Sequence, residues 1–275
     1  MKLYRWGGRR YSCSVMFKFL IAFLLVGFSS SLLRAEDKVI HLFVALCDNE
    51  TQAIAKVGAK IGNGDDPENN LYWGCSDGAQ KIFGRSKLWK KIEEHKPQAA
   101  DPKSPILRRT IFQHKKTKTI LIAEAYQGKL MKSCLQDYLD SSAGSHTPEI
   151  EVKAWKRKIK GGSASKLTCF IGHNGLMEHP VTAEKAEVQP ELDTITLCCI
   201  SHSYFKPYFE AAKTRPIVQT KSLMYPGAFI LHDVIEGWLI GETRNQLRTR
   251  AAKAYAKNQK IKLAGGYSIF QKLDE

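Results

Sequence analysis

The sequence predicts an α/β fold of three layers, with a mostly parallel central sheet covered by helices on both faces. Three observations lead to this prediction. Short runs rich in β-branched and apolar residues recur along the chain, segments with helical apolar spacing lie between them, and no internal repeat or low-complexity tract breaks the pattern. Strands that alternate with helices are typical of parallel sheets with both faces buried.

The predicted strands are five apolar segments. They span residues 39–47, 119–126, 166–172, 194–198 and 216–220. A strand that is buried on both faces of a sheet has this continuous apolar character, whereas a half-exposed strand alternates apolar and polar residues. The five segments therefore supply the central sheet.

The predicted helices carry apolar residues at spacings of three and four. They span residues 78–91, with Asp77 as the N-cap, and residues 129–139, 227–240 and 242–259. Residues 61–70 predict a loop; their oxygen-bearing side chains lack the spacing of an EF-hand calcium loop. The polar segment 141–165 predicts a surface excursion, with a hairpin as its simplest form.

The first 35 residues predict a secretory signal peptide. Basic residues precede an apolar run at 19–28, and the small residue Ala35 precedes the expected cleavage site. The run is shorter than the roughly 20 residues that span a bilayer. Cleavage leaves one domain, residues 36–275, in the periplasm or outside the cell. The alternatives are an uncleaved N-terminal anchor and a start at Met16.

The charge of the predicted mature chain is basic. Six of the 42 Lys and Arg residues lie in residues 1–35, which contain no acidic residue, so 36 basic residues face 27 acidic ones and the net charge is +9. The basic clusters at 114–118 and 153–160 contain only Trp155 as an aromatic residue, which disfavours nucleic acid as a partner. The charge predicts a solvated basic face, with an anionic cell envelope or an acidic substrate as alternative partners.

The cysteines of residues 36–275 predict neither a metal site nor a disulfide framework. No CxxC pair and no zinc-ligand spacing occurs, and most of these cysteines lie in apolar runs, as buried thiols do. We therefore expect no metal or other cofactor. The six residues are Cys47, Cys75, Cys134, Cys169, Cys198 and Cys199.

Two predicted strands end in residues with catalytic potential. The strand at 166–172 ends at His173, and the strand at 194–198 ends at Cys199, 26 residues later. If these strands are parallel neighbours, both side chains lie at the same sheet edge. An imidazole can take the proton from a thiol and return it to a leaving group. Alternation along a strand would then turn Cys198 toward the core.

The stretches LTCFIGHNG and TITLCCIS resemble the catalytic core of caspase-like cysteine peptidases, a group that includes caspases, legumain and gingipains. In that group an apolar strand ends in His-Gly, and the next ends in the nucleophilic Cys. The segments at 39–47, 71–83, 119–128, 131–139 and 216–239 resemble the family's other elements in the same order. Part of the N-terminal text, from residue 41 to 75, also resembles a group of exported bacterial proteins.

The resemblance implies a caspase-like fold and an exported cysteine endopeptidase that acts on a peptide or protein substrate. His173 would be the general base and acid, Cys199 the nucleophile, and the backbone at Asn174 and Gly175 part of an oxyanion hole. The sequence departs from the family at Asn174, where Gly is usual. Two alternatives remain open: a caspase-like binding module without catalysis, and another exported α/β protein in which the two residues meet by chance.

Overall fold

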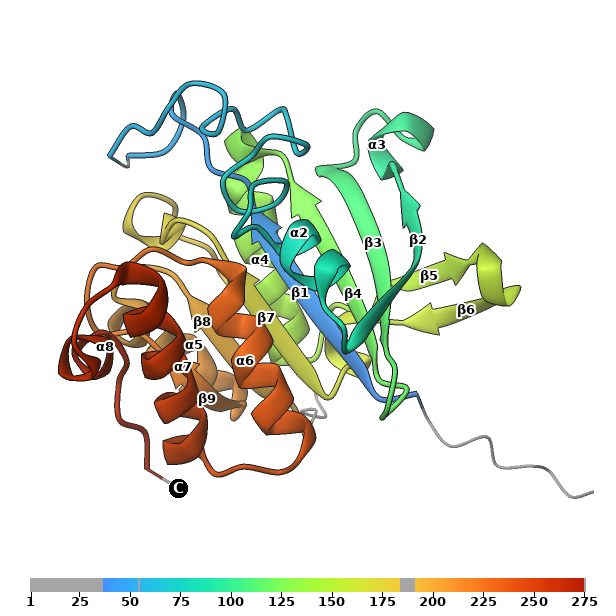
Figure 1. Cartoon of the computed structure of the whole chain (residues 1–275). Coiled ribbons are helices and arrows are strands. Elements are labelled where there is room, and N and C mark those ends of the chain that lie inside the picture. The colour runs from blue at the N-terminus through green and yellow to red at the C-terminus, as the bar shows by residue number, and fades with distance from the viewer. Residues whose placement is uncertain (1–36, 54, 184–190, 275) are drawn as a thin grey trace, which may run out of the picture. The chain divides into compact units, whose positions relative to one another are not determined.

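A seven-stranded sheet forms the centre of the computed structural model, which describes residues 37–53, 55–183 and 191–274 (Figure 1). The predicted signal peptide lies outside these residues. The strand order is β2-β3-β4-β1-β7-β8-β9. The strands are β1 (Val39–Ala45), β2 (Trp89–His95), β3 (Ile106–His114), β4 (Ile120–Tyr126), β7 (Leu167–Ile171), β8 (Asp193–Leu197) and β9 (Arg215–Gln219).

The sheet is mostly parallel, as predicted. Strands β4, β1, β7, β8 and β9 run in one direction, and β2 and β3 add an antiparallel edge beside β4. Strands β7 and β8 are direct neighbours, which confirms the predicted pairing of the two segments that lead to His173 and Cys199. The strand order changes direction at β1, and ligands of open α/β sheets bind near such a point.

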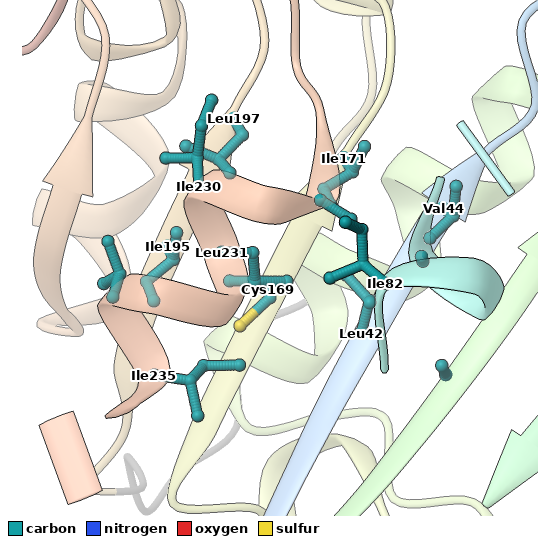
Figure 2. Close-up of a cluster of buried hydrophobic side chains, with 14 of the residues drawn as sticks. Leu42, Val44, Ile82, Cys169, Ile171, Ile195, Leu197, Ile230, Leu231 and Ile235 are labelled. Atoms are coloured by element: carbon teal, nitrogen blue, oxygen red, sulfur yellow. The ribbon is translucent and has the colours of Figure 1, made fainter. Parts of the chain in front are cut away.

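One face of the sheet is covered by α2 (Ala79–Arg85), α6 (Ala228–Leu239) and α7 (Arg244–Gln259). Figure 2 shows the buried side chains between this layer and the strands. Leu42 of β1 and Ile195 of β8 lie in the same core as Ile82 of α2 and Leu231 of α6. The N-terminus of α7 has a capping box, because Thr243 and Gln246 bond to each other's backbone amides.

The opposite face is covered by α4 (Met131–Ala143) and α5 (Ser201–Ala212), which pack on Phe43 and Phe170. A hairpin of β5 (Glu149–Val152) and β6 (Arg157–Lys160) covers a smaller apolar cluster beside it. The hairpin lies in the segment for which the sequence predicts a surface excursion. The remaining α-helices are the short α3 (Pro97–Ala100) and α8 (Leu263–Ile269). Within the described residues, no helix has both the length and the apolar character needed to cross a bilayer.

The predicted helix at 78–91 is wrong over its second half. Helix α2 ends at Arg85, and the chain from Trp89 forms strand β2. Asp77 does not cap the helix, since Gly78 is the N-cap residue and no side chain bonds there. The Trp89 indole is buried and its Nε1 donates to Glu236 Oε1 of α6 at 2.9 Å. This contact between distant segments outweighs the local helical spacing.

Candidate active site

His173 and Cys199 lie at the ends of neighbouring parallel strands. Ile171 of β7 pairs with Leu197 of β8, and each candidate residue follows its strand by two positions. The Asn174 side chain joins the two strand ends, because its Nδ2 donates to the carbonyl oxygen of Cys199 at 2.7 Å. The structure therefore places His173 and Cys199 at the ends of adjacent strands, at the same edge of the sheet.

The imidazole of His173 is held by a carboxylate. Its Nε2 lies 2.6 Å from Oε1 of Glu178, and only 7% of the His173 side chain is exposed. Glu178 follows the short 3₁₀ segment η4 (Gly175–Met177), and its Oε2 lies 3.5 Å from the amide nitrogen of Ala53. With its proton on Nε2, directed at the carboxylate, the ring has Nδ1 as its basic nitrogen.

Cys199 is the partly exposed member of the vicinal cysteine pair. Its Sγ lies 3.4 Å from the amide nitrogen and 3.6 Å from the carbonyl oxygen of Met224, in the segment after β9. A backbone N–H directed at sulfur stabilises negative charge there. Cys198 is fully buried against α5, as the alternation along the strand predicts.

The other described thiols are held in their neutral form. Burial raises the pKa of Cys198 well above its usual value. Burial and the nearby Asp48 carboxylate raise the pKa of Cys47 to about 11. Neutral thiols are poor nucleophiles, so burial disfavours attack by these residues. Burial likewise raises the pKa values of Cys75, Cys134 and Cys169.

The turn between Cys199 and helix α5 is strained. Ile200 adopts left-handed backbone angles, with φ 51° and ψ 35°, which is unusual for a β-branched residue. Such conformations cost about 1–3 kcal/mol and persist where the surroundings enforce them. Here Ser201 Oγ accepts from the Thr220 amide at 2.8 Å and donates to the Thr196 carbonyl at 2.9 Å.

The strained turn leads directly into helix α5, which begins two residues after Cys199. The first amides of a helix carry partial positive charge that favours a nearby anion. In α5 the first two amides are already used, because Ser201 N–H donates to Thr220 Oγ1 at 3.0 Å and His202 N–H donates to the Thr220 carbonyl at 2.9 Å. The amide of Met224 is the backbone donor that the structure directs at the Cys199 sulfur.

Of the two predicted oxyanion residues, Gly175 has its backbone N–H already engaged. The Gly175 N–H donates to the carbonyl of His173 at 3.0 Å. Asn174 is fully buried and its Oδ1 has no hydrogen-bond partner among the described residues. The Asn174 side chain bonds instead through Nδ2, which donates to the Cys199 carbonyl.

The end of β1 completes the surroundings of the two strand ends. The Asn70 side chain bonds to both backbone groups of Cys47, with Oδ1 accepting at 3.0 Å and Nδ2 donating at 2.8 Å. These two hydrogen bonds hold the loop that follows β1 in place beside Tyr72. Burial, and then the neighbouring Cys47 and Cys199 thiols, raise the pKa of the Tyr72 hydroxyl. Tyr72 is therefore a neutral neighbour of the candidate nucleophile.

Two partners of the site are not predicted from the sequence. Glu178 is the first acidic residue after His173, five positions on, and this is the only sequence signal for its role. The Met224 contact uses backbone atoms, so the identity of the side chain gives no sequence signal for it.

His202 lies three positions after Cys199 and is a second histidine near it in the sequence. Its Nδ1 lies 2.9 Å from Oε1 of Gln219. In the described part of the chain, no cluster of three or more potential metal ligands occurs.

Comparison of the chain with protein-family models, with curated proteins and with solved structures finds no match.

Proposed function

We propose that this protein is a cysteine hydrolase, and specifically an endopeptidase of caspase-like fold. The observation that carries the proposal is the placement of His173 and Cys199 at adjacent strand ends, with Glu178 bound to the imidazole. A nucleophile, a base and a group that orients the base are the three parts that covalent catalysis requires.

The reaction follows from these positions. His173 accepts the proton of the Cys199 thiol, and the thiolate attacks the carbonyl carbon of the scissile bond. The imidazolium, stabilised by Glu178, then protonates the leaving amine, which departs and leaves a thioester on Cys199. Water attacks the thioester with His173 again as base, and the carboxylic acid product and the free thiol are released.

The strand order supports the caspase-like part of the proposal. The parallel strands lie in the order β4-β1-β7-β8-β9, so the second strand along the chain flanks the first on one side and the third, fourth and fifth follow on the other. His173 follows the third parallel strand and Cys199 the fourth. This is the arrangement that the resemblance of the His and Cys motifs implies.

Thiol labelling tests the proposal directly. We expect iodoacetamide to modify Cys199 at neutral pH at least tenfold faster than any other described cysteine, because the remaining thiols are kept neutral by burial. Mass spectrometry of digested protein after short exposures locates the label. The Cys198→Ala variant should be labelled at the wild-type rate. Equal slow labelling of all six cysteines in the folded protein would contradict the proposal.

A second prediction concerns Glu178. Glu178→Gln should lower kcat by about 100-fold with little change in KM, since the amide cannot stabilise the imidazolium that forms during reaction. Glu210→Gln, which removes an exposed carboxylate of α5 paired with Lys206, is the matched control. A kcat of Glu178→Gln equal to that of the wild type would contradict this role of Glu178.

The alternative is a peptide-binding module without catalysis. The observation that favours it is the engagement of the Cys199 thiol by both backbone groups of Met224, together with the engaged N–H of Gly175. This alternative predicts peptide binding with slow thiol labelling, and it predicts that Cys199→Ala binds peptide as well as the wild type does.

A further inference from the structure

The C-terminal part of the chain is strongly basic. Residues 243–273 contain eight Lys and Arg residues and no acidic residue. Part of this charge serves the fold: Arg248 bonds to the carbonyls of Tyr267 and Phe270, and Arg250 forms an ion pair with Glu242. Other cations of this segment take no part in any salt bridge within the described residues, namely Lys253, Lys257, Lys260 and Lys262.

The turn between α7 and α8 combines this charge with exposed apolar side chains. Every residue from 257 to 264 is exposed, and the order Lys260-Ile261-Lys262-Leu263 alternates cations with large apolar groups. Ile261 is 44% exposed and Leu263 is 41% exposed. Charge alone would suit any polyanion, whereas exposed aliphatic groups between lysines suit the boundary between lipid headgroups and acyl chains.

A cavity of about 580 Å³ lies beside the C-terminal end of α7, and its lining also combines cationic and exposed apolar side chains. It lies among α2, α6 and α7, which Figure 1 shows in front of the sheet. Arg85, Lys87 and Lys257 contribute cations to its lining, and Leu88 contributes a further exposed apolar side chain.

The two carboxylates in this cavity are partly engaged. The Asp77 carboxylate accepts from Asn258 at 3.0 Å, and Asp233 Oδ1 lies 3.4 Å from His232 Nδ1. The lining thus carries three cationic side chains against two carboxylates and keeps a net positive charge, which favours an anion such as a lipid phosphate.

We infer that this surface, formed by Lys257–Leu263 from the last turn of α7 to the start of α8 and by Arg85–Leu88 beside the cavity, docks on an anionic phospholipid bilayer. The lysines contact lipid phosphates, and Ile261 and Leu263 enter the headgroup layer. The inference is independent of the proposed hydrolase, because no residue of the docking surface belongs to the site at the ends of β7 and β8.

Vesicle binding tests the inference in the full chain. The probes are vesicles of phosphatidylcholine and phosphatidylglycerol in equal parts, and vesicles of phosphatidylcholine alone. Sedimentation measures the partition coefficient, and hydrogen exchange of the amides of residues 257–264 shows whether this turn makes the contact. We expect slower exchange there with the anionic vesicles only.

Two variants separate the contribution of the lysine charges from that of apolar side chains entering the bilayer. The triple variant Lys257→Gln, Lys260→Gln, Lys262→Gln should lower the partition coefficient about 100-fold, since each lysine near an anionic surface contributes about fivefold. The double variant Ile261→Ser, Leu263→Ser should lower it about tenfold through lost apolar burial. Ile240→Ser, which removes an apolar side chain that is 70% exposed at the end of α6, is the matched control and should bind as the wild type does.

Three results would overturn the inference. The first is unchanged exchange at residues 257–264 on addition of anionic vesicles. The second is equal protection by neutral and anionic vesicles. The third is a loss of binding in the lysine variant with full binding retained in the Ile261 and Leu263 variant, which would assign the surface to a soluble polyanion instead of a bilayer.

Discussion

Cys199→Ala and His173→Ala each abolish hydrolysis, and the double variant is no less active than either single one. The expected loss in kcat is about four to six orders of magnitude, because nucleophile and base act as one unit and removal of either leaves only binding contributions. The measurement is turnover of a fluorogenic peptide library, with active-site labelling as a second readout. Peptide turnover by purified Cys199→Ala at the wild-type rate would contradict the proposed role.

Cys198→Ala is the matched control for this experiment. The residue is adjacent in sequence to Cys199, but its side chain is buried in the core with Phe205 of α5. Removing one sulfur atom from this core leaves a small cavity, so we expect a loss of about 1–2 kcal/mol in the free energy of unfolding. Hydrolysis at low temperature should remain near the wild-type rate. The opposite pattern, with an inactive Cys198→Ala and an active Cys199→Ala, would exchange the two assignments.

Glu124→Ala lowers the free energy of unfolding by about 3–5 kcal/mol, because it leaves the buried partners of this carboxylate without their counter-charge. Glu124 lies in β4 and is 2% exposed. Its carboxylate contacts Arg109 Nε of β3 at 2.5 Å and His41 Nε2 of β1 at 3.1 Å. Chemical denaturation measures the loss. Glu149→Ala, which removes an exposed partner of Lys158, should cost less than about 1 kcal/mol.

The same network makes stability depend on pH in the acid range. Burial alone would raise the pKa of Glu124, but the charges and hydrogen bonds of His41 and Arg109 outweigh burial and lower the pKa to about 2. A glutamate in the unfolded chain has a pKa of about 4.3. The stabilisation, about 3 kcal/mol, is therefore complete above about pH 5 and is lost as the pH falls toward 2.

The Glu124→Gln variant checks this pH dependence. It should be less stable than the wild type at pH 7, and the difference between the two proteins should shrink steadily as the pH is lowered from about 5 to 2. A difference that stays constant over this range would show that the charge of Glu124 contributes nothing to folding.

The five parallel strands and the helices α4, α6 and α7 could be predicted because their signals are local, whereas the 12-residue helix α5 was not predicted. Apolar runs and helical spacing reflect burial of a face, and burial is the main free-energy term in both kinds of element. Strands β2 and β3 could not be found in this way. The charged Arg109 stands in β3 because Glu124 of the neighbouring strand pairs with it, and Trp89 begins β2 because it packs against α6.

The candidate site was likewise predicted only in part. His173 and Cys199 are evident in the sequence, since each directly follows an apolar strand and parallel neighbours end at the same edge. The carboxylate of Glu178, the backbone of Met224 and the left-handed turn at Ile200 became evident only in the folded chain. Their positions depend on how loops from separate parts of the sequence pack together, and short-range patterns contain no information about such contacts.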